Sequence, residues 1–146
     1  RPLAHRLEPV AERDGVLWVN DSKATNVASA RVALRSMTRP VILLLGGRHK
    51  GEAYTGLLPE LAPRVRLVIA YGEAGPIVES ELREHVPVVR VDGSFEEVVA
   101  RAAREARPGD VVLLAPACAS FDMFRDYEHR GETFTALARG EVGRAA

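Results

Sequence analysis

Strand-like and helix-like segments alternate along the chain of 146 residues. Apolar runs rich in Val, Ile and Leu, without the alternation of a half-exposed strand, predict parallel strands covered on both faces. These runs are Val41–Leu45, Val65–Tyr71, Val88–Val91 and Val111–Ala115. Two further predicted strands, Leu7–Ala11 and Val16–Asn20, flank Asp14-Gly15, which favours a tight hairpin turn. We therefore expect this first pair to be antiparallel.

Amphipathic segments between the apolar runs predict helices. They are Val27–Met37, Leu57–Pro63, Gly75–His85, Phe95–Ala106 and Gly131–Arg139. Ser94 precedes the fourth segment, and Glu97 stands in capping-box register with it. The alternation predicts an α/β fold, a Rossmann-like three-layer sandwich with a mostly parallel sheet of about six strands, one of them antiparallel, and about five helices.

The chain is long enough for one domain, which we expect to cover residues 1–146 and to end in a frayed tail at 141–146. It begins Arg1-Pro2-Leu3, without an initiator methionine or a signal-peptide pattern. We interpret it as a piece of a longer protein.

The composition argues against a nucleic-acid-binding protein and against a membrane protein. The 20 basic and 20 acidic residues balance, which gives no excess positive field for nucleic acid or a membrane surface. No apolar run approaches the roughly 20 residues of a membrane-spanning helix. The single cysteine, Cys118, cannot form an internal disulfide, which indicates a reducing compartment. We expect a soluble, cytoplasmic protein with neither nucleic acid nor membrane as a partner.

Three loops after predicted strands carry the candidate chemistry, because open α/β sheets bind ligands beyond the carboxyl ends of their parallel strands. The first loop is Asn20-Asp21-Ser22-Lys23-Ala24-Thr25-Asn26. Helix capping by Asp21, Ser22 or Thr25 is one interpretation. Lys23 favours a bound anion, since a cation just before a helix N-terminus otherwise opposes the helix dipole.

The second loop is Gly46-Gly47-Arg48-His49-Lys50-Gly51. Paired glycines allow a ligand to approach the backbone, and potentially cationic side chains follow them. The loop lacks the Gly-Lys-Ser/Thr order of a Walker A motif. It is therefore either a carboxylate or phosphate site or a simple turn.

The third loop runs from Ala115 to Phe124. We interpret Cys118 as a small buried apolar residue and Ser120, near a helix start, as a hydroxyl donor to a ligand. The histidines of the chain show no metal-ligand spacing with one another or with Cys118; they are His5, His49, His85 and His129. We predict no metal site made by this chain alone.

Four segments together resemble the C-terminal domain of the Mur ligase family. They are His5-Arg6-Leu7-Glu8, Asn20-Asp21-Ser22-Lys23-Ala24-Thr25-Asn26, Leu44-Leu45-Gly46-Gly47 with Lys50, and Pro116-Ala117-Cys118-Ala119-Ser120-Phe121-Asp122. The second is the specific one, and the resemblance extends in order from about His5 to Ala138. It implies a ligase with an N-terminal domain for a UDP substrate, a central domain with the ATP P-loop, and this chain as the third domain.

Within the family, the resemblance is to the members that add D-glutamate to UDP-N-acetylmuramoyl-L-alanine in peptidoglycan synthesis. It implies that ATP phosphorylates the substrate carboxylate and that the amine of D-glutamate attacks the acyl phosphate. ATP and Mg²⁺ would be held mainly by the central domain, so the isolated chain is expected to be inactive. A folylpolyglutamate-synthase-like ligase domain and a non-catalytic nucleotide-binding module are the alternatives.

The resemblance also implies roles for residues on the nucleotide side of the site. Arg6 and Asp21 would lie near ATP, with Asp21 accepting hydrogen bonds from ribose hydroxyls. Lys23 would be the catalytic residue, close to the phosphates and the reacting centre.

On the amino-acid side, Thr25 and Lys50 would hold the α-carboxylate of D-glutamate. Ser120 and the backbone of Tyr127 would hold its side-chain carboxylate. Arg48 receives no role, and His49 is no more than a candidate. Lys23 and Lys50 are the only lysines among the 20 basic residues, and both lie in these loops. This distribution fits anionic ligands, because a compact ammonium and a planar guanidinium are not interchangeable.

Overall fold

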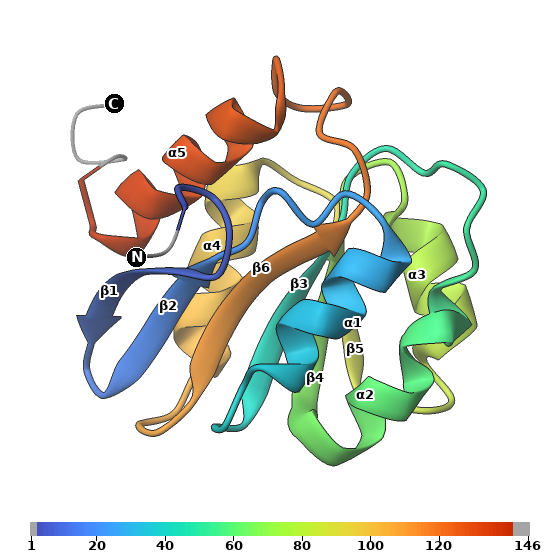
Figure 1. Cartoon of the computed structure of the whole chain (residues 1–146), viewed down its shortest axis with the longest axis horizontal. Helices are drawn as coiled ribbons and strands as arrows, with labels where there is room; N and C mark the ends of the chain where they lie inside the picture. Colours follow the sequence, from blue (N-terminus) through green and yellow to red (C-terminus); the bar gives the residue numbers. More distant parts are fainter. Residues whose placement is uncertain (1–2, 142–146) are drawn as a thin grey trace.

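The computed structural model describes residues 3–141, and one six-stranded sheet in the order β1-β2-β6-β3-β4-β5 forms its centre (Figure 1). The strands are β1 (Glu8–Arg13), β2 (Val16–Asn20), β3 (Val41–Gly46), β4 (Val65–Tyr71), β5 (Val88–Val91) and β6 (Val111–Ala117). The pair β1 and β2 is antiparallel, and all other neighbouring strands are parallel. The predicted mostly parallel sheet with one antiparallel strand is confirmed.

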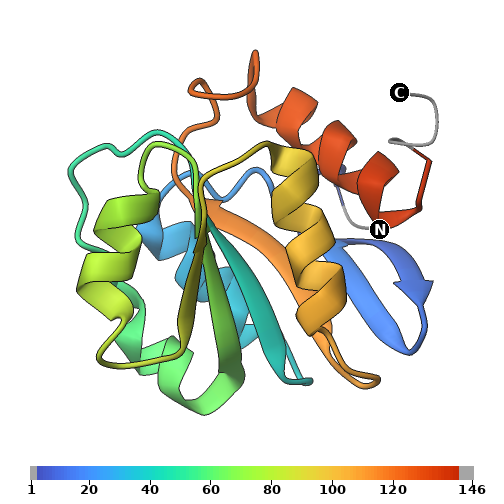
Figure 2. The ribbon, with the colours of Figure 1, turned by 180° about the vertical axis from the view of Figure 1, so that it is seen from behind.

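Helices cover both faces of the sheet (Figures 1 and 2). They are α1 (Val27–Arg35), a short 3-10 helix η1 (Tyr54–Leu57), α2 (Leu58–Arg64), α3 (Gly75–Leu82), α4 (Phe95–Glu105) and α5 (Tyr127–Ala138). α1, α2 and α3 pack on one face, and α4 and α5 pack on the other. This arrangement confirms the three-layer sandwich.

Strand β3 shows why the core strands lack hydrophobic alternation. All six of its residues are buried. Leu43 and Leu45 pack toward α1, whereas Ile42 and Leu44 pack toward α4. Because both faces are covered, every position needs an apolar side chain, and each fully buried leucine contributes about 1.5–3 kcal/mol.

The last helix begins earlier than predicted, at Tyr127 instead of Gly131. Asp126 is its N-cap and accepts a hydrogen bond from the backbone N–H of His129. Gly131 is an interior residue of α5, and a Cβ atom there would lie 2.2 Å from Nδ1 of His5. The glycine marks a close contact and not a helix boundary.

The predicted start of the fourth helix agrees with the structure. Ser94 and Glu97 form the complete capping box at the start of α4. Within residues 3–141, no helix is long and apolar enough to cross a membrane. Apart from Glu141, the tail expected at 141–146 lies outside the described residues.

Candidate functional site

The loops that follow β2, β3 and β6 meet at one edge of the sheet, where the parallel strands end (Figure 1). The backbone N–H of Ala117 donates to the carbonyl of Ala24 at 2.9 Å. The N–H of Arg48 donates to the carbonyl of Ala119 at 2.8 Å. The three loops singled out from the sequence therefore form one continuous region.

A buried arginine from α5 joins two of these loops. The Nε and Nη2 atoms of Arg130 donate to the hydroxyl and carbonyl oxygens of Ser22 at 2.9 and 2.8 Å, and Nη1 donates to the carbonyl of Cys118 at 3.0 Å. Burial lowers the pKa of Arg130, yet arginine stays protonated in proteins. Sequence patterns missed this residue. The interior glycine next to it, Gly131, is the one signal that could have pointed there.

Some polar residues of the first loop hold the fold together. The side chain of Asn20 is fully buried, and its oxygen accepts from the N–H of Ser22 at 3.0 Å. The hydroxyl of Ser22 donates to the carbonyl of Tyr127 at 2.6 Å. Asn26 is the N-cap of α1 and accepts from the N–H of Ser29 at 2.8 Å.

The capping interpretation of Asp21, Ser22 and Thr25 is consequently wrong, because Asn26 takes that position. Helix capping therefore does not account for Asp21, Thr25 or the intervening Lys23. These side chains are available for another purpose.

Arg6, Asp21 and Lys23 line one cleft of about 200 Å³. The carboxylate of Asp21 accepts from the N–H of Leu7 at 3.0 Å through Oδ1. Burial raises the pKa of Asp21, while the hydrogen bond from Leu7 and the charge of Arg6 act in the opposite direction. The cleft thus combines a carboxylate acceptor with two cationic side chains.

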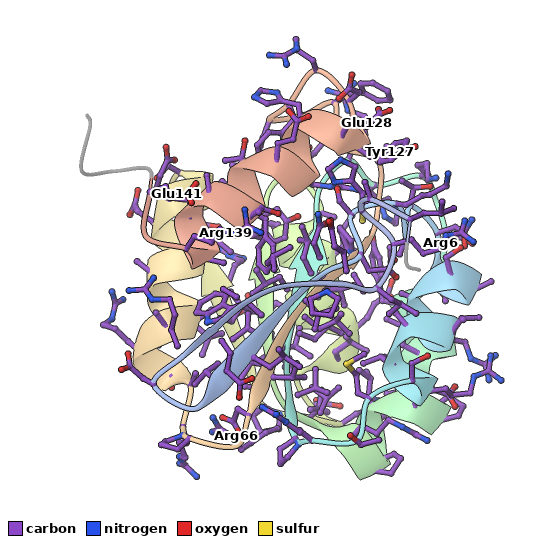
Figure 3. The ribbon with its side chains drawn as sticks, turned by 60° about the vertical axis from the view of Figure 1, so that its left-hand side comes forward. Arg6, Arg66, Tyr127, Glu128, Arg139 and Glu141 are labelled. Atoms are coloured by element: carbon purple, nitrogen blue, oxygen red, sulfur yellow. The ribbon has the colours of Figure 1, made fainter. Side chains whose placement is uncertain are left out.

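Lys23 connects this cleft with the beginning of α5. Its ammonium lies 5.6 Å from the ring centroid of Tyr127, within the range of a cation–π contact. Tyr127 is the first residue of α5, and N–H groups in the first turn of a helix have no partner inside the helix. Figure 3 shows Tyr127 and Arg6 toward the same end of the molecule.

The remaining predicted residues do not line that cleft; they are Thr25, Lys50, Ser120 and Tyr127. Lys50 is exposed, and Thr25 is half-buried. The loop of Lys50 reaches the start of α1, where Oε1 of Glu52 accepts from the N–H of Val27 at 3.0 Å. Neither lysine of the chain takes part in an ion pair within residues 3–141.

Ser120 is buried, with 2% of its surface exposed. Its carbonyl accepts hydrogen bonds from the N–H groups of Met123 and Phe124, so Ser120 opens a turn instead of the expected helix. Cys118 is buried, as predicted.

The paired glycines serve the packing of the loops. A Cβ atom at Gly46 would lie 2.1 Å from the carbonyl oxygen of Tyr71, and one at Gly47 would lie 2.5 Å from that of Ala119. Gly47 also has a φ of +124°, which favours glycine. These glycines therefore admit the close approach of neighbouring backbone.

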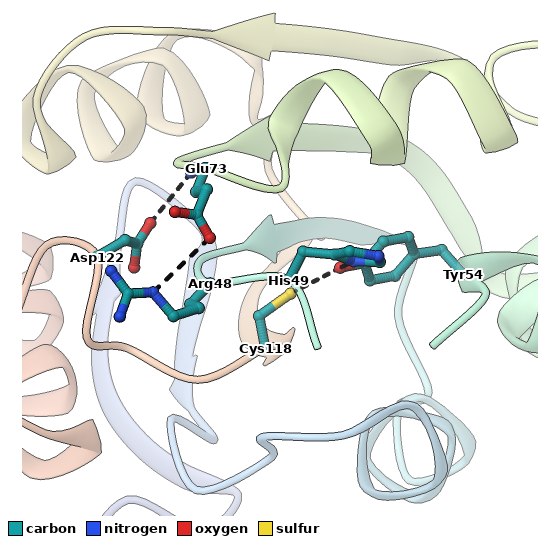
Figure 4. A network of polar contacts seen from close by, with 6 residues as sticks. All are labelled: Arg48, His49, Tyr54, Glu73, Cys118 and Asp122. Atoms are coloured by element: carbon teal, nitrogen blue, oxygen red, sulfur yellow. Dashed lines mark hydrogen bonds and ion pairs between the residues drawn. The ribbon is translucent and has the colours of Figure 1, made fainter. Parts of the chain in front are cut away.

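Nearby polar contacts reinforce the same loops. Arg48 forms an exposed ion pair with Glu73, and Asp122 accepts from the N–H of Glu73 at 3.1 Å (Figure 4). Among the described residues, no group of three or more His, Cys, Asp or Glu side chains is arranged to hold a metal ion.

Comparison with known proteins gives a family match over most of the chain. The family described as "Mur ligase, glutamate ligase domain" matches residues 5–118. The UDP-N-acetylmuramoylalanine--D-glutamate ligase of Nitratidesulfovibrio vulgaris (strain DP4) is 53% identical over 135 residues, which are 92% of this chain and 31% of that protein. The chain thus spans less than a third of this relative's length.

Solved structures show the same fold at low identity. A UDP-N-acetylmuramate-alanine ligase from Thermotoga maritima has a TM-score of 0.60 and 15% identity, covering 99% of this chain and 30% of that one. A bifunctional folylpolyglutamate synthase/dihydrofolate synthase from Yersinia pestis, complexed with AMPPNP and Mn ion, has a TM-score of 0.62 and 22% identity, covering 93% of this chain and 32% of that one.

Proposed function

The chain belongs to the Mur ligase family, and on this premise we propose that it is the C-terminal domain of a three-domain ligase that uses ATP to join D-glutamate to UDP-N-acetylmuramoyl-L-alanine. The 53% identity with a D-glutamate ligase over 92% of this chain supports that substrate. The folylpolyglutamate alternative rests on a likeness of fold at 22% identity.

The observation that carries the proposal is the cleft in which Arg6, Asp21 and Lys23 meet. Oδ1 of Asp21 takes the N–H of Leu7, and the rest of the carboxylate can accept from the ribose hydroxyls of ATP. Arg6 and Lys23 supply positive charge for the phosphates. ATP, when bound, activates the substrate carboxylate as an acyl phosphate, and we assign most contacts to ATP and Mg²⁺ to the central domain.

The amino-acid substrate has two separated carboxylates and so requires two anion sites. We assign Thr25 and Lys50 to the α-carboxylate, and Ser120 with the backbone N–H of Tyr127 to the side-chain carboxylate. The first turn of α5 favours an anion through its free N–H groups and its dipole. Lys23, beside Tyr127, then lies where negative charge develops as the amine attacks, and fixed charges and orientation lower such barriers.

The chain alone contributes substrate binding and orientation, and we expect it to release no ADP in the presence of all substrates. The free thiol of Cys118 agrees with a cytoplasmic location, where thiols stay reduced.

Steady-state assays of the complete ligase test the proposal. D-glutamate should support ADP release, and L-glutamate should not. Lys50→Gln should raise the KM for D-glutamate roughly 10- to 100-fold, as expected for loss of a charged hydrogen bond, and leave the KM for ATP unchanged. Ligation by the isolated chain, or a preference for L-glutamate, would contradict the proposal.

A further inference from the structure

A tyrosine hydroxyl connects the loop after β3 with the loop after β6. Nδ1 of His49 lies 2.8 Å from the hydroxyl oxygen of Tyr54, and that oxygen lies 3.0 Å from Sγ of Cys118 (Figure 4). Tyr54 and Cys118 are each 1% exposed. The contacts therefore form a continuous chain from a half-buried histidine to a buried thiol.

The positions of the protons in the contacts between Cys118, Tyr54 and His49 follow from the donors and acceptors present. Burial raises the pKa of Cys118 to about 11, so the thiol keeps its proton at neutral pH and can donate it to the oxygen of Tyr54. Burial also raises the pKa of Tyr54, whose own proton is then available to Nδ1 of His49. When the thiol donates to the tyrosine and the tyrosine donates to the histidine, the acceptors are an oxygen and a nitrogen atom, which are both better acceptors than sulfur.

The stretch from His49 to Gly51 has few other anchors. Within residues 3–141, its backbone groups make no hydrogen bond to other backbone groups, and a Cβ atom at Gly51 would meet nothing within 4 Å. Hydrogen bonds anchor the chain on both sides of this stretch. The N–H of Arg48 donates to the carbonyl of Ala119, and the carboxylate of Glu52 accepts from the N–H of Val27. The imidazole of His49 is thus the polar contact that holds the middle of the loop.

The two ends of this chain of contacts adjoin two proposed ligand contacts. Lys50 directly follows His49, and Ser120 stands two residues after Cys118. We propose that Tyr54 is a positioning residue whose hydroxyl fixes the spacing between Lys50 and Ser120, and thereby selects an acidic amino acid of the length of glutamate.

This inference rests on the proposed function, because Lys50 and Ser120 are the groups assigned there to the two carboxylates. Aspartate is shorter by one methylene and cannot reach both groups at a fixed spacing. With the link broken, the loop of Lys50 can shift, so affinity for D-glutamate and discrimination against D-aspartate both fall.

The test is Tyr54→Phe in the complete ligase, which removes one oxygen atom from a buried ring. The KM for D-glutamate should rise about 5- to 10-fold, the effect of one lost hydrogen bond, with kcat changed less than about 2-fold and the KM for ATP unchanged. The preference for D-glutamate over D-aspartate should fall by a similar factor. A purely structural role would lower activity without altering this preference.

Tyr71→Phe is the matched control. Tyr71 is also 1% exposed; its hydroxyl lies beside the guanidinium of Arg130 but forms no hydrogen bond with the stretch from His49 to Gly51 in the described part of the chain. The same substitution there should leave the KM and the preference for D-glutamate unaltered.

Variants of His49 test the link from its other end. His49→Ala should reproduce the effect of Tyr54→Phe, and His49→Asn, whose side-chain oxygen can occupy the position of Nδ1, should restore much of the affinity. If Tyr54→Phe fails to fold, as judged by circular dichroism, the KM values of the two His49 variants test the proposal instead.

Two kinds of failure are distinguishable. A wild-type ligase that does not use D-glutamate overturns the proposed function. A wild-type ligase that uses it, while Tyr54→Phe and His49→Ala keep the normal KM and preference, overturns the role of Tyr54 alone.

Discussion

Two aspartates with nearly equal burial lie at opposite edges of the sheet. Asp110, just before β6, is 4% exposed, and Asp21, just after β2, is 5% exposed. Asp110 forms an ion pair with Arg66 and accepts from the N–H of Arg107 at 2.9 Å. Asp21 accepts one backbone N–H and has the charge of Arg6 nearby, without an ion pair in the described part of the chain.

The comparison separates a carboxylate used for stability from one available for binding. Figure 3 shows the two edges, with Arg66 at the bottom and Arg6 above. The partners of Asp110 are all internal, whereas Asp21 keeps acceptor capacity inside a cleft and its pKa is raised by burial. Burial alone therefore does not identify a functional carboxylate. The proposed binding role of Asp21 rests on its place in the cleft.

The largest expected effect is at the edge that carries Asp110. Asp110→Ala removes the acceptor of the hydrogen bonds from Arg66 and from the N–H of Arg107, and should lower the free energy of unfolding of the chain by about 3–5 kcal/mol. Urea unfolding measures the change. Asp92→Ala is the control, because Asp92 pairs with Arg90 at an exposed site and should contribute less than about 1 kcal/mol. Equal losses in the two variants would contradict the distinction between buried and exposed pairs.

An intermediate effect is expected at the edge that carries the site. Gly47→Ala combines a left-handed φ with a Cβ atom 2.5 Å from the carbonyl of Ala119, and should destabilise the chain by about 2–3 kcal/mol. Gly109→Ala is the matched control at the opposite edge, since Gly109 has a φ of +96° but open space around it. Thermal unfolding should give Gly109→Ala the smaller loss. The reverse order would contradict the packing role of Gly47.

The sequence predicted the fold well because the strands of a covered sheet are nearly continuous apolar runs. The run Val41–Leu45 needs apolar side chains at every position. Strand β3 covers this run and extends it by one residue, Gly46. The start of α5 was misplaced because Gly131 weakens helical propensity, and the reason for the glycine is its contact with His5, far away in the sequence.

The site was predictable only in part. The polar loop after β2 was evident, but the division of its residues between structure and binding depends on distant partners. The hydroxyl of Ser22 is hydrogen-bonded by Arg130 from α5, and the proposed role of Tyr54 depends on Cys118 in the loop after β6. Such contacts leave no periodic pattern along the chain.

The smallest expected effect on stability is that of Asp21→Asn, and its sign is opposite to that of Asp110→Ala. A raised pKa means that the folded chain binds the Asp21 proton more tightly than the unfolded chain. The stability of the wild type should therefore fall, relative to the variant, as pH rises from the ordinary pKa of 3.8 through the raised value. The asparagine oxygen can still accept from the N–H of Leu7, so that contact remains.

Urea unfolding at pH 4 and pH 7 measures this difference. Asp21→Asn should gain stability over the wild type between the two pH values, while the KM of the complete ligase for ATP increases because a ribose acceptor is lost. Stability and binding then change in opposite directions at Asp21, as expected for a carboxylate whose burial is retained for a ligand. A wild type that gains stability over the variant with rising pH would show that the folded chain favours the ionised form of Asp21, and the distinction between the two edges would be lost.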